Sequence, residues 1–177
     1  MVNYGQLSIA NHKLYKQLLG TKRVDYEARI NAALGKILRN FNFLELNLGL
    51  CLRALAHPND PSASHGLLNR AGMPETIERL KKLLAQCEHI PDTSAFDEWA
   101  MRAEEIRPLR NYYVHATWDY LPLREESPLE FKIPPWRREQ IEGRSQGSMR
   151  IEDLEADAER IEAVFDEFQS IRRQYGV

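Results

Sequence analysis

Cysteine is scarce in this chain, and the two that it has do not form a ligand pattern. Cys51 and Cys87 stand alone among 177 residues, and neither belongs to a Cys-x2-Cys spacing. Four of the five histidines are also scattered without the spacing of zinc ligands: His12, His57, His65 and His89. We therefore expect two reduced, packed thiols, no metal site and no bound cofactor.

Long apolar runs are absent too. No stretch approaches the length of a membrane-spanning helix, and the N-terminus lacks the apolar core of a secretory signal. The expectation is a cytoplasmic protein with no membrane contact. Charge is nearly balanced, with a net charge of -2 and a pI near 6.2, so the whole molecule exerts no general attraction on polyanions. Any binding of RNA must come from a local patch.

Glycine-rich phosphate loops and Ser or Cys nucleophile constellations are missing as well. What remains is helical periodicity across one domain, residues 1–177, which predicts an all-α, antiparallel helical bundle. We expect helices at about 26–56, 74–88, 94–118 and 151–175. Residues 1–24 form an N-terminal arm or short helix that stops at Gly20, and residues 120–148 form a loop or β-hairpin insertion before the last helix.

Three local features refine this expectation. Pro108 lies inside the third main helix, where it predicts a kink or a restart. The alternating stretch Leu129–Ile133 predicts one strand or half of a hairpin. Ser148 is a candidate N-cap for the last helix.

The stretch from Arg110 to His115, late in the third main helix, carries the strongest chemical signal. An arginine offers a planar fork of donors for phosphate oxygens, and a histidine can take and return protons near neutral pH. Asn111 and His115 share a helix face at spacing i, i+4, whereas Arg110 is rotated away. Our hypothesis is that the Asn111 amide holds one ring nitrogen of His115 while Arg110 reaches toward a substrate.

Glu45 is the candidate supporting residue. It falls between Phe41 and Leu48 on the apolar stripe of the helix at 26–56, where an isolated carboxylate would be costly. In one interpretation it meets Arg110 or His115 across the bundle and orients the motif. In the other it lies at the edge of the stripe, paired with Arg53, Arg102 or water.

These residues resemble the HEPN superfamily of small all-helical domains, whose hallmark is an arginine, a polar residue and a histidine late in a helix. The run Arg110-Asn111-Tyr112-Tyr113-Val114-His115-Ala116-Thr117-Trp118 is similar to the Arg-Asn, aliphatic-before-His and small-residue-then-Trp pattern of bacterial members. The resemblance is specific over about ten residues and architectural elsewhere.

That resemblance implies metal-independent cleavage of RNA, in which the ribose 2'-hydroxyl attacks the adjacent phosphate and leaves a 2',3'-cyclic phosphate. His115 would then be the general base or acid, Arg110 would bind the scissile phosphate, and Asn111 would occupy the variable polar position after the arginine. It also implies a homodimer in which two motifs face each other across one groove.

The aromatic residues beside the motif leave two interpretations open. Trp118 and Tyr112 are candidates for binding substrate, by base stacking or at a phosphate, but aromatic residues beside an apolar stripe more often pack in the core. A basic patch is a second open question. Its residues, interleaved with acids and with Trp136, are Lys132, Arg137, Arg138, Arg144 and Arg150.

The leading function from the sequence is therefore a HEPN-type endoribonuclease. The main rival is a catalytically inactive, dimeric HEPN-like binding or regulatory module in a defence or toxin-antitoxin system, with an antitoxin protein as its partner. A third interpretation is nucleotide binding or transfer to a nucleotide-modifying partner. A silent module would keep the same Arg110 and His115, so the sequence leaves the choice open.

Overall fold

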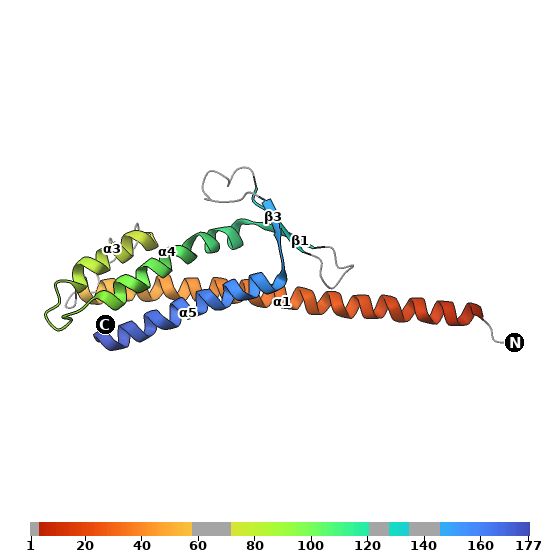
Figure 1. Cartoon of the computed structure of the whole chain (residues 1–177), viewed down its shortest axis with the longest axis horizontal. Coiled ribbons are helices and arrows are strands. Elements are labelled where there is room, and N and C mark those ends of the chain that lie inside the picture. Colours follow the sequence, from red (N-terminus) through yellow and green to blue (C-terminus); the bar gives the residue numbers. More distant parts are fainter. Residues whose placement is uncertain (1–3, 58–71, 121–127, 135–145) are drawn as a thin grey trace.

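The computed structural model is mostly helical, with one small sheet (Figure 1). It describes residues 4–57, 72–120, 128–134 and 146–177, and the side chains of residues 4–19, 21–23, 119 and 120 are left out of that description. The helices are α1 (Tyr4–Ala56), α3 (Met73–Leu84), α4 (Ser94–His115) and α5 (Ile151–Tyr175). The strands are β1 (Thr117–Tyr120), β2 (Leu129–Lys132) and β3 (Gln146–Met149).

α1 is one helix of 53 residues, and here the structure differs from the expected short helix ending at Gly20. Gly20 lies inside the helix, whereas Gly176, after α5, is the glycine with a positive φ (69°) among the described residues. A glycine ends a helix only when the backbone there turns left-handed. The N-terminal arm is therefore the first part of α1, and it projects beyond the other helices (Figure 1).

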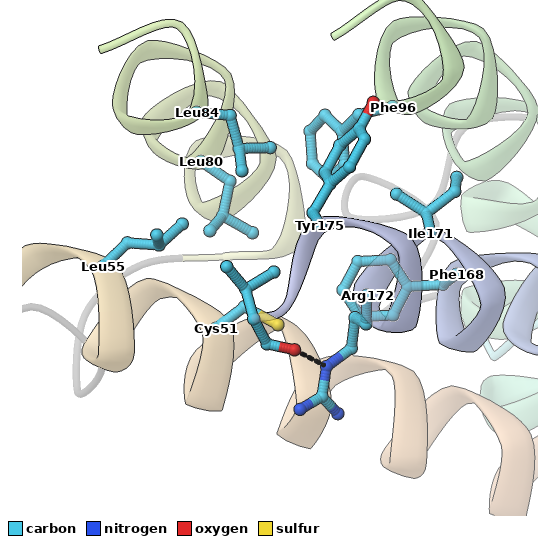
Figure 2. Close-up of a pocket in the computed structure, with 10 residues that line it drawn as sticks. Cys51, Leu55, Leu80, Leu84, Phe96, Phe168, Ile171, Arg172 and Tyr175 are labelled. Atoms are coloured by element: carbon cyan, nitrogen blue, oxygen red, sulfur yellow. Dashed lines mark hydrogen bonds between the residues drawn. The ribbon is translucent and has the colours of Figure 1, made fainter. Parts of the chain in front are cut away.

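The core lies where α1, α3, α4 and α5 meet. α1 buries an apolar stripe of eight residues, most of them three or four apart: Ile30, Ala33, Ile37, Phe41, Leu44, Leu48, Cys51 and Leu52. Figure 2 shows one end of this core, where Leu80 and Leu84 of α3, Phe96 of α4 and Ile171 and Tyr175 of α5 surround Cys51. These side chains leave a gap of only about 10 Å³. Burial raises the pKa of the Cys51 thiol, as fits a packed residue.

The expected helix at 74–88 is shorter than predicted. α3 ends at Leu84, but Pro74 does lie in its first turn, where the missing N–H costs nothing. The segment before it, at 57–72, falls largely on residues 58–71, outside the described residues.

α4 and α5 are joined by polar contacts as well as by apolar packing. The indole Nε1 of Trp99 donates to the Val164 carbonyl at 2.8 Å, although the ring itself is fully buried. Arg102 pairs with Glu167, and Arg160 Nη2 lies 2.7 Å from Glu105 Oε2. Pro108 is accommodated within α4, which continues from Ser94 to His115 rather than restarting.

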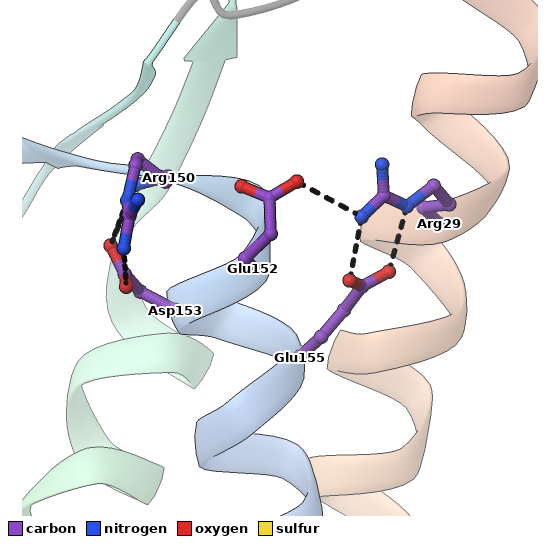
Figure 3. Close-up of polar contacts among 5 residues, drawn as sticks. All are labelled: Arg29, Arg150, Glu152, Asp153 and Glu155. Atoms are coloured by element: carbon purple, nitrogen blue, oxygen red, sulfur yellow. Dashed lines mark hydrogen bonds and ion pairs between the residues drawn. The ribbon is translucent and has the colours of Figure 1, made fainter.

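α5 runs from Ile151 to Tyr175, as predicted, but its N-cap differs. Ser148 lies in β3, and Arg150 is the N-cap, with the Asp153 carboxylate accepting from the Arg150 backbone N–H at 3.2 Å. Figure 3 shows this pair beside a second one, in which Arg29 of α1 binds Glu152 and Glu155. The Arg29 pairs hold the start of α5 against α1, whereas Arg150 and Asp153 cap α5 itself.

The predicted strand at 129–133 is confirmed as β2, and it is the centre of a three-stranded antiparallel sheet in the order β1-β2-β3. The sheet exceeds a single hairpin, since β1 begins at Thr117, before the expected insertion at 120–148. Gly147 of β3 lies opposite Phe131, and a Cβ there would come 2.6 Å from the ring. The close approach of strand and ring therefore requires glycine at that position.

No helix among the described residues is both long enough and apolar enough to cross a membrane. The all-α prediction thus needs one correction, the small sheet that connects α4 to α5.

Candidate functional site

The motif residues lie on the last turns of α4. The helix ends because Ala116 adopts an extended conformation (φ −75°, ψ 145°), although its N–H still bonds to the Tyr112 carbonyl. Thr117 then begins β1, paired with Lys132 of β2. The predicted end of the helix at Trp118 is therefore wrong, because strand pairing takes residues 117–120. Trp118 does not share a helix face with His115.

Trp118 and Tyr112 belong to an aromatic cluster that attaches the sheet to α4. The Trp118 ring stacks on Tyr113 with an interplanar angle of 19° and a centroid distance of 5.6 Å, and its Nε1 donates to the Tyr113 carbonyl at 3.3 Å. Tyr112 packs edge-on against Phe131, with a distance of 4.4 Å between the ring centroids. These contacts give both candidate substrate-binding residues a packing role. Both are half-buried, so part of each side chain also remains accessible.

Tyr113 fixes the cluster to α5. Its hydroxyl donates to Asp157, and its side chain is 5% exposed. Burial, followed by the hydrogen bond to Asp157, raises the pKa of Tyr113 far above the usual tyrosine value. This hydroxyl therefore stays protonated and acts as a structural donor.

A surface hollow opens beside Arg110. Its lining comes from three helices: Phe41 and Glu45 of α1, the residues Gly72, Met73 and Pro74 at the start of α3, and Arg107, Arg110 and Asn111 of α4. The space, counted with the solvent at its mouth, is about 520 Å³. Two arginines, an amide and the positive end of the α3 dipole thus face one volume, an arrangement that suits an anion.

Arg110 is one of four described arginines that form no ion pair with a described carboxylate; the others are Arg53, Arg172 and Arg173. Seven described arginines pair with carboxylates: Arg29, Arg39, Arg79, Arg102, Arg107, Arg150 and Arg160. Arg110 instead donates from Nη1 to the Asn111 Oδ1 at 3.1 Å, and no described carboxylate forms an ion pair with it. Its charge is therefore not compensated by an acid within the described part of the chain, and its remaining donors can serve a ligand.

This bond adds a role for Asn111 to the one expected from the sequence. Its amide oxygen accepts from the neighbouring guanidinium, and its Nδ2 group is a separate donor, so the predicted bond to His115 stays a prediction. Asn111 therefore orients Arg110. The two residues act together at the hollow, although the helix turns Arg110 away from the face that Asn111 shares with His115.

His115 is half-buried on the last turn of α4. It is five residues after Arg110, so the two side chains leave the helix about 140° apart. It is not among the residues that line the hollow. The structure thus brings Arg110, Asn111 and Glu45 together and sets His115 at the adjoining helix end.

Glu45 is exposed, so the expectation of a costly buried carboxylate is wrong. The alternative partner Arg102 is taken by Glu167. Glu45 shares the lining of the hollow with Arg110 without forming an ion pair there, and its exposure fits the second interpretation, a carboxylate at the edge of the stripe. A carboxylate at the rim opposes the charge of the two arginines in the same hollow.

Arg107 was missed by the sequence reasoning. It lies four residues before Asn111, on the same helix face, and its Nε donates to Glu104 at 2.9 Å. The i, i+4 spacing from Asn111 was the signal that could have found it. The start of α3 left no comparable signal, because its place at the hollow depends on packing between distant segments.

The proposed basic patch is only partly described. Lys132 is exposed on β2, and Arg150 is engaged by Asp153. Arg137, Arg138, Arg144 and Trp136 lie outside the described residues. Among the described residues, no group of three or more His, Cys, Asp or Glu side chains is arranged to hold a metal ion.

Searches of protein-family models, of curated proteins and of solved structures gave no match to this chain.

Proposed function

We propose that this chain is a metal-independent endoribonuclease of the HEPN type, with Arg110 and His115 as its catalytic pair. The observation that supports it is the half-buried Arg110, oriented by Asn111 at a surface hollow and paired with no described carboxylate. Such an arginine fits the phosphate of a polynucleotide, and a histidine on the next turn supplies proton transfer near neutral pH.

In the proposed reaction, a phosphodiester lies against Arg110 with its ribose toward His115. His115 takes the proton of the 2'-hydroxyl, the hydroxyl oxygen attacks phosphorus, and the bond to the 5'-oxygen of the next nucleotide breaks. The leaving oxygen is protonated by a second acid, either water or a histidine from another subunit. Arg110 stabilises the charge that builds on the phosphate oxygens.

The divergence of Arg110 and His115 favours one rival. Side chains that leave a helix about 140° apart do not converge on one atom without a long reach by the arginine. A catalytically inactive HEPN-like module, which binds RNA or an antitoxin protein without cutting, would have no need for that convergence. In the enzyme, a homodimer would remove the difficulty by bringing a second motif to the same groove.

Cleavage of mixed RNAs in the presence of EDTA tests the proposal. We expect wild type to cut and to leave 2',3'-cyclic phosphate ends, and His115→Ala to lose roughly 10²- to 10⁴-fold in rate. Arg110→Ala should lose a similar or larger factor, because its charge faces the transition state.

Met101→Ala is the matched control, because Met101 is exposed on the same helix, more than two turns before the motif. It should cut at the wild-type rate. Absence of cleavage by wild type, or equal cleavage by all four proteins, would contradict the proposed nuclease activity. Retained RNA binding that is lost in Arg110→Ala would then support the binding module.

A further inference from the structure

The hollow beside Arg110 contains a carboxylate that a phosphate does not use. Glu45 is exposed on α1 and lines the hollow together with Arg107, Arg110 and Asn111 of α4. Within the described part of the chain, no ion pair or hydrogen bond joins Glu45 to another residue. A phosphate bound by the arginines would be repelled by this carboxylate. Glu45 therefore suits a second group of the same ligand, one that donates hydrogen bonds.

The two helices that line the hollow offer opposite hydrogen-bonding groups. On α1, the ionised Glu45 has two acceptor oxygens and no donor. On α4, Arg107 donates from Nε to Glu104, and its terminal nitrogens form no bond with another described residue. Asn111 also keeps its Nδ2 donor, because only its oxygen is used by Arg110. A ligand in the hollow must therefore present donors toward α1 and acceptors toward α4.

Among the four RNA bases, guanine has this pattern. Its Watson–Crick edge carries N1–H and N2–H side by side, two donors that match the two oxygens of a carboxylate. Its other edge carries O6 and N7, the pair of acceptors that arginine binds most often in nucleic acids. Adenine and cytosine have an acceptor nitrogen beside the amino group, and uracil has a carbonyl on each side of its N–H. Each of these three bases would set a lone pair against Glu45.

The apolar part of the hollow suits a flat ring. Phe41 and Met73 are 2% and 8% exposed, so they close the bottom, whereas Pro74 is exposed at the rim. The space of about 520 Å³, counted with its mouth, falls within the range of roughly 300–1,000 Å³ that is typical of small-molecule sites. It has room for one unstacked base, the form in which single-stranded RNA is read by proteins.

We propose that the hollow selects guanine in single-stranded RNA, with Glu45 accepting from N1–H and N2–H and Arg107 donating to O6 and N7. The position of this guanosine along the strand rests on the proposed nuclease function. There, Arg110 binds the scissile phosphate and the attacking ribose points toward His115, which does not line the hollow. The next nucleotide, which carries the leaving 5'-oxygen, thus lies in the hollow. Cleavage is expected immediately before a guanosine.

Fluorescence anisotropy of labelled five-nucleotide RNAs tests the base selection without cleavage. The RNAs carry one variable base between uridines, and they are 2'-O-methylated throughout because this removes the attacking hydroxyl. Wild type should bind the guanosine oligomer about tenfold or more tightly than the adenosine, cytidine or uridine oligomers. Inosine, which lacks only the N2 amino group of guanosine, should bind about fivefold or more weakly than guanosine.

Glu45→Gln should change the preferred base, a result that misfolding does not produce. An amide offers one acceptor and one donor, which match the amino group and the ring nitrogen of adenine. We expect this variant to lose about tenfold for the guanosine oligomer and to bind the adenosine oligomer at least as tightly. Glu159→Gln is the matched control, because Glu159 is exposed on α5, which contributes nothing to the lining. It should keep the preference for guanine.

The role of Arg107 is tested with 7-deazaguanosine, which lacks the N7 acceptor. This base should weaken binding to wild type by about fivefold, and it should cause no further loss in Arg107→Gln. An equal loss in both proteins would overturn the contact between Arg107 and N7.

Mapping of cleaved ends separates the base selection from the nuclease activity itself. Products that begin with a 5'-hydroxyl guanosine are expected. Cleavage spread evenly over the four bases would overturn the base selection and leave the nuclease standing. Guanine-selective binding without any cleavage would support the base selection and contradict the nuclease. Equal binding of all four oligomers, or tighter binding of 5'-GMP than of the guanosine oligomer, would overturn the proposal.

Discussion

Both ends of α5 bury apolar side chains, but they differ in their charged contacts. At its C-terminal end, Phe168, Ile171 and Tyr175 are buried among apolar side chains of α1, α3 and α4 (Figure 2). At its N-terminal end, Ile151 and Leu154 are buried as well, and Glu152 and Glu155 also bind Arg29 of α1 at the surface (Figure 3). The buried side chains contribute stability through desolvated area, and the surface pairs mainly fix where α5 begins.

The largest expected effect is at the C-terminal end of α5. Phe168 is 1% exposed and packs against Trp99 with a centroid distance of 4.6 Å. Phe168→Ala should lower the free energy of unfolding by about 3–5 kcal/mol, because it removes buried area and leaves a cavity. Urea denaturation measures the loss. A loss below about 1 kcal/mol would show that this end is not the main source of stability.

An intermediate effect is expected where α5 is bonded to α4 beside the motif. Tyr113→Phe removes the hydroxyl that donates to Asp157 near the start of α5, and should cost about 1–2 kcal/mol at neutral pH. Because the pKa of Tyr113 is raised in the folded protein, the free energy of unfolding also depends on pH. Above about pH 10 the unfolded chain ionises this tyrosine while the folded chain does not, so its contribution to stability falls.

Thermal unfolding of wild type and Tyr113→Phe from neutral to alkaline pH tests this point. The gap between the two proteins should be constant up to about pH 9 and should narrow above about pH 10. A gap that widens there would mean that the folded protein ionises Tyr113 first. Phe131→Leu, in the same cluster, removes no hydroxyl and should show no such narrowing.

The smallest effect is expected at the surface ion pairs near the start of α5. Arg29→Gln breaks the pairs with Glu152 and Glu155, and should cost at most about 1 kcal/mol because its side chain is 45% exposed. The bonds from Arg29 lower the pKa of Glu155. The contribution is therefore present above the unfolded glutamate pKa, near 4.3, and is lost as pH falls through the lower folded value.

Denaturation at low and at roughly 1 M salt checks the assignment. The difference between wild type and Arg29→Gln should shrink in high salt, whereas the loss in Phe168→Ala should persist. A salt-independent cost at Arg29 would mean that its aliphatic stem, and not its charge, holds α1 to α5.

The sequence predicted the elements whose ends are set by residues nearby in the chain. The bounds of α5 follow from its acids at the start, its basic residues at the end and Gly176 after it. The first turn of α3 follows from Pro74, and β2 follows from an alternating pattern. In each case the deciding interaction lies within a few residues of the element.

Gly20 resembles a helix stop, yet α1 continues through it. The other failures come from interactions between distant segments, since Thr117 and Trp118 would extend α4 if β2 did not pair with them. Ser148 resembles a cap but lies in a strand. At the site, the sequence could single out Arg110 and Asn111, but the bond between them and the hollow formed with α3 depend on side-chain geometry that periodicity does not encode.

Gly147 and Phe131 show how one close contact can tie two positions together. The ring fills the space that any Cβ at position 147 would need, and the same ring supports Tyr112 and Trp118 beside the motif. A larger residue at 147 is therefore compatible with this sheet only when position 131 carries a smaller one. Neither position can change alone, so the packing behind the last turn of α4 constrains a strand more than thirty residues later in the chain.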